Sequence, residues 1–191
     1  MKKLLLASVL TAATLTAGVA SAASYKVDVE GAHAFINFKI KHLGYSWLSG
    51  RFNDFDGKFN YDENELEASQ IQVVIQTDSL DSNHAERDKH LKGKDFLDVS
   101  KFPTATFTST AYNAKDANSG ELTGQLEFHG VTKIISFPVE KIGEGDDPWG
   151  GHRAGFSGIT SLKLADYGIS YNLGPQSTHV ELELYIEGIR Q

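Results

Sequence analysis

The sequence predicts an all-β protein, an extended eight-stranded antiparallel β-barrel with a short helix at its mouth. Along most of the chain apolar and polar residues alternate with period two, as in strands with one buried and one solvated face. Turn signals such as "NSG", "HG" and "LGP" separate these segments. A long sheet with one wet face must close or fold over to protect its edges, so a sandwich and a barrel both fit. Glycines within the strands (Gly124, Gly155 and Gly158) suit tight bending and favour the barrel.

The alternation places eight strands along the chain. We expect them at residues 34–42, 51–62, 70–77, 104–110, 121–130, 133–141, 153–164 and 179–188. In the first, Ile36 and Ile40 lie on one face and Lys39 on the other. In the second, Phe52 and Phe55 break the alternation, which predicts a bulge or a bend.

The stretch "NHAERDKHLKGK" breaks the period-two pattern and predicts a short helix. Asn83 can cap it, with Glu86 three residues later, and Gly93 can end it. Leu91 is its one large apolar residue, so its face should rest on the barrel. Three polar residues share that face and would point toward the mouth: His84, Arg87 and Asp88.

The N-terminus reads as a cleaved secretory signal peptide. A basic "MKK" precedes a short apolar run and the small-residue signal "ASA" at residues 20–22. We place the cleavage between Ala22 and Ala23, so residues 1–22 are the signal and residues 23–191 form one domain. The expected location is the periplasm.

Charge and cysteine content exclude several kinds of partner and site. The chain has 18 basic and 25 acidic residues, and Lys2 and Lys3 leave with the signal. This acidic balance argues against nucleic acid and against simple electrostatic docking on anionic lipid headgroups. Without cysteine, there is no disulfide framework, thiol nucleophile or cysteine zinc site.

The remaining motifs do not predict catalysis, a metal or a phosphate cradle. His84 and Asp88 lie one turn apart, but no HExxH motif accompanies them. We therefore expect neither a bound metal ion nor an organic cofactor. No G-x-S-x-G elbow is present. The glycine-rich stretch 143–156 carries acids that repel phosphate, and it reads as a turn, in which Trp149 and Arg153 can line an opening.

The inward face is rich in phenylalanine, and pattern alone leaves two interpretations open. An eight-stranded barrel can be filled by side chains or can hold one small ligand, as lipocalins do. Alternation cannot distinguish a packed core from a tunnel.

Three stretches resemble the YceI-like family of bacterial periplasmic proteins, in its signal-peptide-bearing branch. They are "HAFINFKIKHLGYSWLSGRFNDFDG", "NHAERDKHLKGKDFLDVSKFPTATFTST" and "GDDPWGGHRAGF". The resemblance runs from about Tyr25 to the end of the chain. It implies a lipocalin-like barrel whose tunnel holds a polyisoprenoid or other long amphiphile, homodimers, a link to stress responses and no established enzymatic activity.

With this resemblance the tunnel becomes the favoured interpretation, and its candidate residues follow. We expect these residues to line the tunnel: Ile36, Phe38, Ile40, Phe55, Phe59, Val73, Ile75, Phe96, Phe107, Leu126, Phe128, Phe137, Phe156, Leu162 and Leu182. We expect these at the mouth, near the ligand headgroup: His84, Arg87, Asp88, Trp149 and Arg153.

The leading hypothesis is a non-catalytic periplasmic carrier of an isoprenoid lipid, of the quinone or polyprenyl phosphate type. It would bind no nucleic acid and would not insert stably into a membrane. One alternative is a pH-responsive structural or chaperone-like protein, since seven histidines would charge in acid. Another is an enzyme acting on the lipid, with Asp88 and His84 as acid and base.

Overall fold

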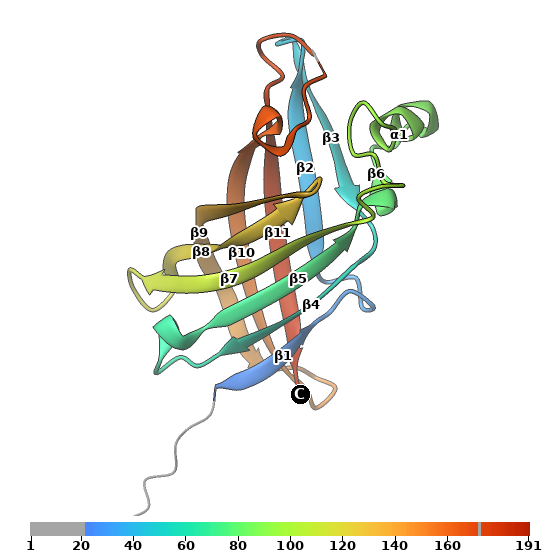
Figure 1. Ribbon diagram of the computed structural model, residues 1–191. Helices are drawn as coiled ribbons and strands as arrows, with labels where there is room; N and C mark the ends of the chain where they lie inside the picture. Colours follow the sequence, from blue (N-terminus) through green and yellow to red (C-terminus); the bar gives the residue numbers. More distant parts are fainter. Residues whose placement is uncertain (1–21, 172) are drawn as a thin grey trace, which may run out of the picture.

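The protein is an antiparallel β-barrel closed by eight strands, seen here in a computed structural model that describes residues 22–171 and 173–191 (Figure 1). Of the expected signal peptide, residues 1–22, only Ala22 is among the described residues, and the expected cleavage between Ala22 and Ala23 stays a prediction. The closed ring has the order β1-β4-β5-β7-β8-β9-β10-β11, with β11 pairing back to β1. The predicted barrel is therefore confirmed, and the sandwich is excluded.

The strands and helices have the following bounds: β1 Ala23–Val27, β2 Phe35–His42, β3 Ser46–Phe52, β4 Phe55–Tyr61, β5 Gln70–Gln76, β6 Leu80–Asp81, α1 Ala85–Leu91, β7 Thr104–Ala114, β8 Ser119–Phe128, β9 Val131–Asp146, β10 His152–Lys163 and β11 His179–Arg190. Short 3-10 turns cover Leu66–Ala68, Thr77–Ser79 and Leu164–Tyr167. Of the helices in the described part of the chain, none has the length and apolar character needed to cross a bilayer.

β1 and β2 each cover only one part of the length of the barrel. β11 pairs with β2 over Val180–Tyr185 and with β1 over Gly188–Arg190, so β1 and β2 share one edge of it. β3 and β4 are likewise separated only by Asn53 and Asp54, the bend that the broken alternation predicts. β2, β3 and β6 therefore extend the wall at the end that carries α1, which we call the mouth end (Figure 1).

Two strand glycines make room for aromatic rings. A Cβ on Gly50 would lie 2.4 Å from Phe38 Cζ, and one on Gly124 would lie 2.5 Å from Phe107 Cζ. The sequence interpretation of Gly124 as a bending point is thus incomplete, because its absent side chain lets a neighbouring ring lie flat on the wall.

The core divides into a packed end and a looser end. At the end opposite α1, which we call the closed end, Tyr25 stacks on Phe59 with ring centroids 4.8 Å apart, and Phe156 meets Phe59 edge-on. Burial, together with the neighbouring Glu144 carboxylate, raises the pKa of Tyr25 to about 12. Toward the mouth the inward side chains surround open space, which creates the candidate site.

Candidate ligand-binding tunnel

The larger of two cavities opens at the mouth end. It has a volume of about 720 Å³ and is lined by inward residues of β2, β3, β8, β10 and β11, together with α1 and the segments that follow α1 and β10. This volume lies within the range of roughly 300–1,000 Å³ typical of small-molecule sites. Most of the residues that line it are apolar, and Arg87 adds a positively charged side chain to the wall.

A smaller cavity of about 150 Å³ continues toward the closed end. Four residues line both cavities: Ile36, Ile75, Leu126 and Leu182. The two cavities therefore lie next to each other along the barrel axis, with these four side chains, which we call the waist, between them. A wide cavity followed by a small one along one axis suits a chain-like molecule better than a compact one.

Most residues expected in the tunnel lie on its wall. Besides the four at the waist, the mouth cavity is lined by Phe38, Ile40, Phe96, Phe128 and Leu162, and the inner cavity by Phe59, Val73, Phe107, Phe137 and Phe156. Phe55 is different. It directly follows the bend at Asn53 and Asp54, and it is buried in the closed-end core, away from both cavities.

The start of α1 is fixed by hydrogen bonds centred on Ser82. Arg87 Nε donates to Ser82 Oγ at 2.7 Å, and Arg87 Nη2 donates to the Ser82 carbonyl at 2.5 Å. Asp88 Oδ1 accepts from the Ser82 N–H at 2.9 Å and from the Ser82 hydroxyl. Of this group, Ser82 and Arg87 line the cavity, whereas Asp88 does not.

The cap of α1 lies one residue later than predicted. His84 is the N-cap, and its Nδ1 accepts from the Arg87 N–H at 3.2 Å. Asn83 instead adopts a φ of 61°, with its N–H donating to Asp81 Oδ1. Asparagine tolerates this left-handed conformation, so it turns the chain rather than capping the helix. His84 is therefore occupied with the helix and does not line the tunnel.

Trp149 and Arg153 lie at the closed end, far from Arg87. The loop that carries Trp149 joins β9 to β10, and Trp149 is 80% exposed. Arg153 Nη1 donates to Asp28 Oδ2 at 2.6 Å and to Glu187 Oε1 at 2.7 Å, and its Nε donates to Asp147. The five residues expected around one headgroup are thus split between the two ends of the barrel.

The same ion pairs explain the cluster of possible metal ligands at Asp28, His33 and Glu187. The Arg153 guanidinium bonds both carboxylates, so a cation already lies between them. Burial alone would raise the pKa of Asp28, but hydrogen bonds from Arg153, His33 and the Gly31 N–H outweigh it and lower the pKa to about 2. The cluster is therefore a structural clasp at the closed end.

Sequence reasoning missed a polar group inside the inner cavity. Lys141 lines it, and its Nζ donates to Tyr61 Oη at 2.9 Å and to Glu144 Oε2 at 3.4 Å. The hydrogen bond to Tyr61 raises the pKa of Lys141. Strand parity could have found it, since Lys141 follows Phe137 and Val139 on the inward face of β9.

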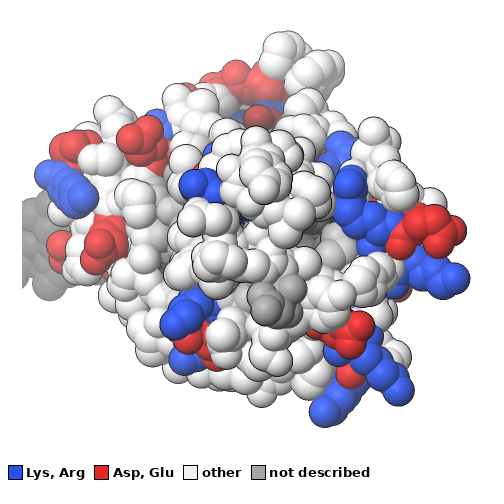
Figure 2. Space-filling view, turned by 90° about the horizontal axis from the view of Figure 1, so that it is seen from above, with Lys and Arg blue, Asp and Glu red and all other residues white. Residues whose placement is uncertain are grey.

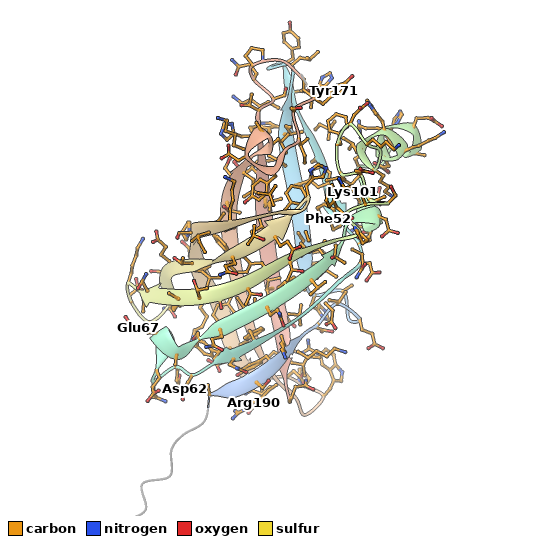
Figure 3. The ribbon with its side chains drawn as sticks, viewed as in Figure 1. Phe52, Asp62, Glu67, Lys101, Tyr171 and Arg190 are labelled. Carbon is orange, nitrogen blue, oxygen red and sulfur yellow. The ribbon has the colours of Figure 1, made fainter. Side chains whose placement is uncertain are left out.

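The outer edge of the mouth was also missed. Four apolar residues there line the cavity: Leu43, Trp47, Tyr171 and Leu173. Leu43 lies in the β2–β3 turn, Trp47 at the start of β3, and Tyr171 and Leu173 in the segment between β10 and β11. The alternation pattern did not include any of these positions. Figure 3 shows Tyr171 at this end, with Asp62 and Arg190 at the other.

Comparisons with known proteins agree with this architecture. A family described as "YceI-like domain" matches residues 25–188. A UPF0312 protein of Pseudomonas aeruginosa is 59% identical over 191 residues, covering all of both chains, and Protein YceI of Salmonella arizonae is 52% identical with the same coverage.

Solved structures show the same fold. A YceI protein of Campylobacter jejuni matches with a TM-score of 0.70 and 29% identity, covering 80% of this chain and 90% of the other. BcnA of Burkholderia cenocepacia matches with a TM-score of 0.74 at 20% identity, covering 84% and 98%. A polyisoprenoid binding domain of Saccharophagus degradans, implicated in plant cell wall breakdown, matches with a TM-score of 0.65 at 18% identity, covering 88% and 99%.

Proposed function

Since this chain belongs to the YceI-like family, we propose that it is a non-catalytic carrier of a long-chain isoprenoid lipid held in the barrel tunnel. The observation that carries the proposal is that two apolar cavities lie end to end inside the barrel and share the waist residues Ile36, Ile75, Leu126 and Leu182. A polyisoprenoid binding domain of the same fold supports the ligand class.

The chemistry of the wall favours a chain of repeated apolar units. Transfer of an apolar chain from water gains about 0.8 kcal/mol per buried CH₂, so even a modest length gives firm capture. The larger cavity leaves room for a polar head beside Arg87, while the tail would extend past the waist toward Phe107 and Phe137. A quinone and a polyprenyl phosphate both fit this arrangement.

The geometry supports binding rather than turnover. The two groups that an enzyme would use, Asp88 and His84, hold the start of α1 and do not face the cavity.

We further propose that the carrier works in the periplasm after cleavage of residues 1–22, as a homodimer with a role in stress. The basic start, the apolar run and the small-residue signal "ASA" support export and cleavage. The resemblance to the YceI-like family implies the dimer and the role in stress.

A fluorescence titration tests the binding proposal. The chain has two tryptophans, so a Trp149→Phe variant leaves Trp47 on the cavity wall as the reporter. We expect a short and a long polyprenol both to change Trp47 emission saturably. Absence of a saturable change with either polyprenol, or with a prenylated quinone, would contradict the proposal.

Filling the inner cavity tests where the tail lies. Val139→Phe, in the Trp149→Phe background, puts a ring into the narrow end of the tunnel. It should weaken binding of the long polyprenol and leave the short one unchanged. Ile134→Phe on the outer face of the same strand, where Ile134 is exposed, is the matched control.

A further inference from the structure

The rim of the mouth exposes apolar side chains to solvent. Every residue from Lys41 to Trp47, which covers the end of β2, the β2–β3 turn and the start of β3, is exposed, including Leu43, Tyr45 and Trp47. Tyr45 is 88% exposed. Across the opening Tyr171 is also exposed, from the segment between β10 and β11. Packing within the barrel does not explain this group.

The turn itself holds a leucine in a conformation that leucine disfavours. Leu43 has a φ of 53° and Gly44 a φ of 84°, and the Tyr45 N–H donates to the His42 carbonyl at 3.0 Å. This is a two-residue hairpin turn with positive φ at both central positions, for which asparagine is the favoured first residue. The left-handed conformation costs a residue like leucine roughly 1 kcal/mol. The chain thus places an apolar side chain at the tip although the turn geometry favours a polar one.

The exposed rim is continuous with the tunnel. Leu43, Trp47 and Tyr171 line the mouth cavity with one part of their surface and meet solvent with another. Seen from above, the centre of this face is uncharged, and lysine, arginine and acidic side chains stand mainly around its edge (Figure 2). A lipid leaving the tunnel by this route would pass directly over these side chains.

The charges of the protein are distributed unevenly between its ends. The three segments around the mouth, 38–52, 77–103 and 161–181, hold nine basic and eight acidic residues, whereas the rest of the chain from residue 23 holds seven and seventeen. The segment 38–52 has Lys39, Lys41 and Arg51 and no acid, and of these Lys39 is paired with Glu181 and Glu183 of β11. The excess of acidic residues therefore lies outside these three segments, and the segments themselves are close to neutral, so they do not oppose approach of the mouth to an anionic surface.

We propose that this rim, residues 41–47 together with Tyr171, docks reversibly on an anionic phospholipid bilayer. Tyrosine and tryptophan favour the membrane–water interface, and each basic residue near an anionic surface contributes about 1 kcal/mol. The docked mouth would let a lipid move between bilayer and tunnel without crossing water. The inference rests on the proposed function and adds the partner to it.

Vesicle binding measures the docking directly. The Trp149→Phe protein is mixed with vesicles of phosphatidylcholine and phosphatidylglycerol that contain no isoprenoid, and Trp47 emission and co-sedimentation are followed. We expect a blue shift, quenching by brominated lipid, and weaker binding to pure phosphatidylcholine or at high salt.

Two variants make the test specific to the rim. Leu43→Asn combined with Tyr45→Asn suits the turn, so the fold should be retained, and vesicle binding should fall at least tenfold. Ile142→Asn, at an exposed isoleucine toward the closed end of β9, should leave binding unchanged. Equal losses in both variants, or no vesicle binding by the parent protein, would overturn the docking.

The outcome is separable from that of the proposed function. If polyprenols bind the tunnel but the rim variant transfers them between vesicles as fast as its parent, docking at the rim is wrong and the carrier function stands. If vesicles bind through the rim but no polyprenol enters the tunnel, the carrier function fails while the docking surface stands.

Discussion

The two ends of this barrel are built from the same alternating strands, yet one is packed and the other is hollow. At the closed end Tyr25, Phe59 and Phe156 stack and cross one another, and Arg153 ties three strand ends together through Asp28 and Glu187. At the mouth end, β2, β3 and α1 widen the wall around a cavity of about 720 Å³. The comparison indicates that stability and binding are carried by different regions of the molecule.

Removing a ring from the packed end should have the largest effect. Phe55→Ala should lower the free energy of unfolding by about 3–5 kcal/mol, because Phe55 is buried in the core away from both cavities and its removal opens a void there. Ile40→Ala, on the cavity wall, should cost less than about 1.5 kcal/mol, since fewer contacts are lost there. Urea denaturation of both variants, each without ligand, measures the difference. Equal losses would mean that the two ends are packed alike.

A charge on the tunnel wall should affect binding most. Phe38→Asp puts a carboxylate into the mouth cavity beside Phe52, whose ring centroid lies 5.8 Å away. We expect affinity for a long polyprenol to fall about a hundredfold, or about 2.7 kcal/mol. Asn37→Asp on the outer face of the same strand is the control and should bind as the parent does. Circular dichroism of both confirms that the barrel is retained.

The clasp at the closed end should make stability depend on acid. The pKa of Asp28 is lowered to about 2 in the folded protein, so its ionised form stabilises the fold. That contribution is present above the unfolded pKa of about 4 and is lost as the pH falls toward 2, at a cost of roughly 1–2 kcal/mol. Denaturation at several pH values should show this loss in the parent protein. An Asp28→Asn variant that retained the same slope would exclude Asp28 as its source.

The smallest effect should come from the arginine at the mouth. Arg87→Ala should weaken binding of a polyprenyl phosphate several-fold and that of a prenylated quinone less, because a guanidinium bonds phosphate strongly. Its hydrogen bonds to Ser82 also hold α1, so thermal stability is measured alongside affinity. Lys89→Ala, an exposed residue of the same helix, is the control. Identical losses for both ligands would exclude Arg87 from headgroup recognition.

Strand parity predicted the tunnel wall because each inward residue is fixed by its neighbours on the same strand. It placed Ile36, Leu126 and Leu182 on the inward face, where they form the waist. It also placed Phe55 inward, in phase with Phe59 on β4, but it could not show that Phe55 is packed in the core rather than exposed to a cavity. It could not distinguish a tunnel from a filled core, since the free volume depends on how far the strands spread.

The mouth could not be assembled from motifs alone. Segment 82–103 and the loop carrying Trp149 are separated by β7, β8 and β9, an odd number of antiparallel strands, so they lie at opposite ends. Counting the three strands between Arg87 and Arg153 would have predicted that these residues lie at opposite ends of the barrel. Tyr45 and Tyr171 of the rim lie in a turn and a loop, where strand periodicity makes no prediction.

The most direct test of the carrier account is native mass spectrometry of the protein exported with its own leader and released gently from the periplasm. The account predicts a bound species of isoprenoid mass that Val139→Phe shifts toward shorter chains and Ile134→Phe does not. A protein that carries no lipid, and takes up none when polyprenols, polyprenyl phosphates and prenylated quinones are offered, would contradict it.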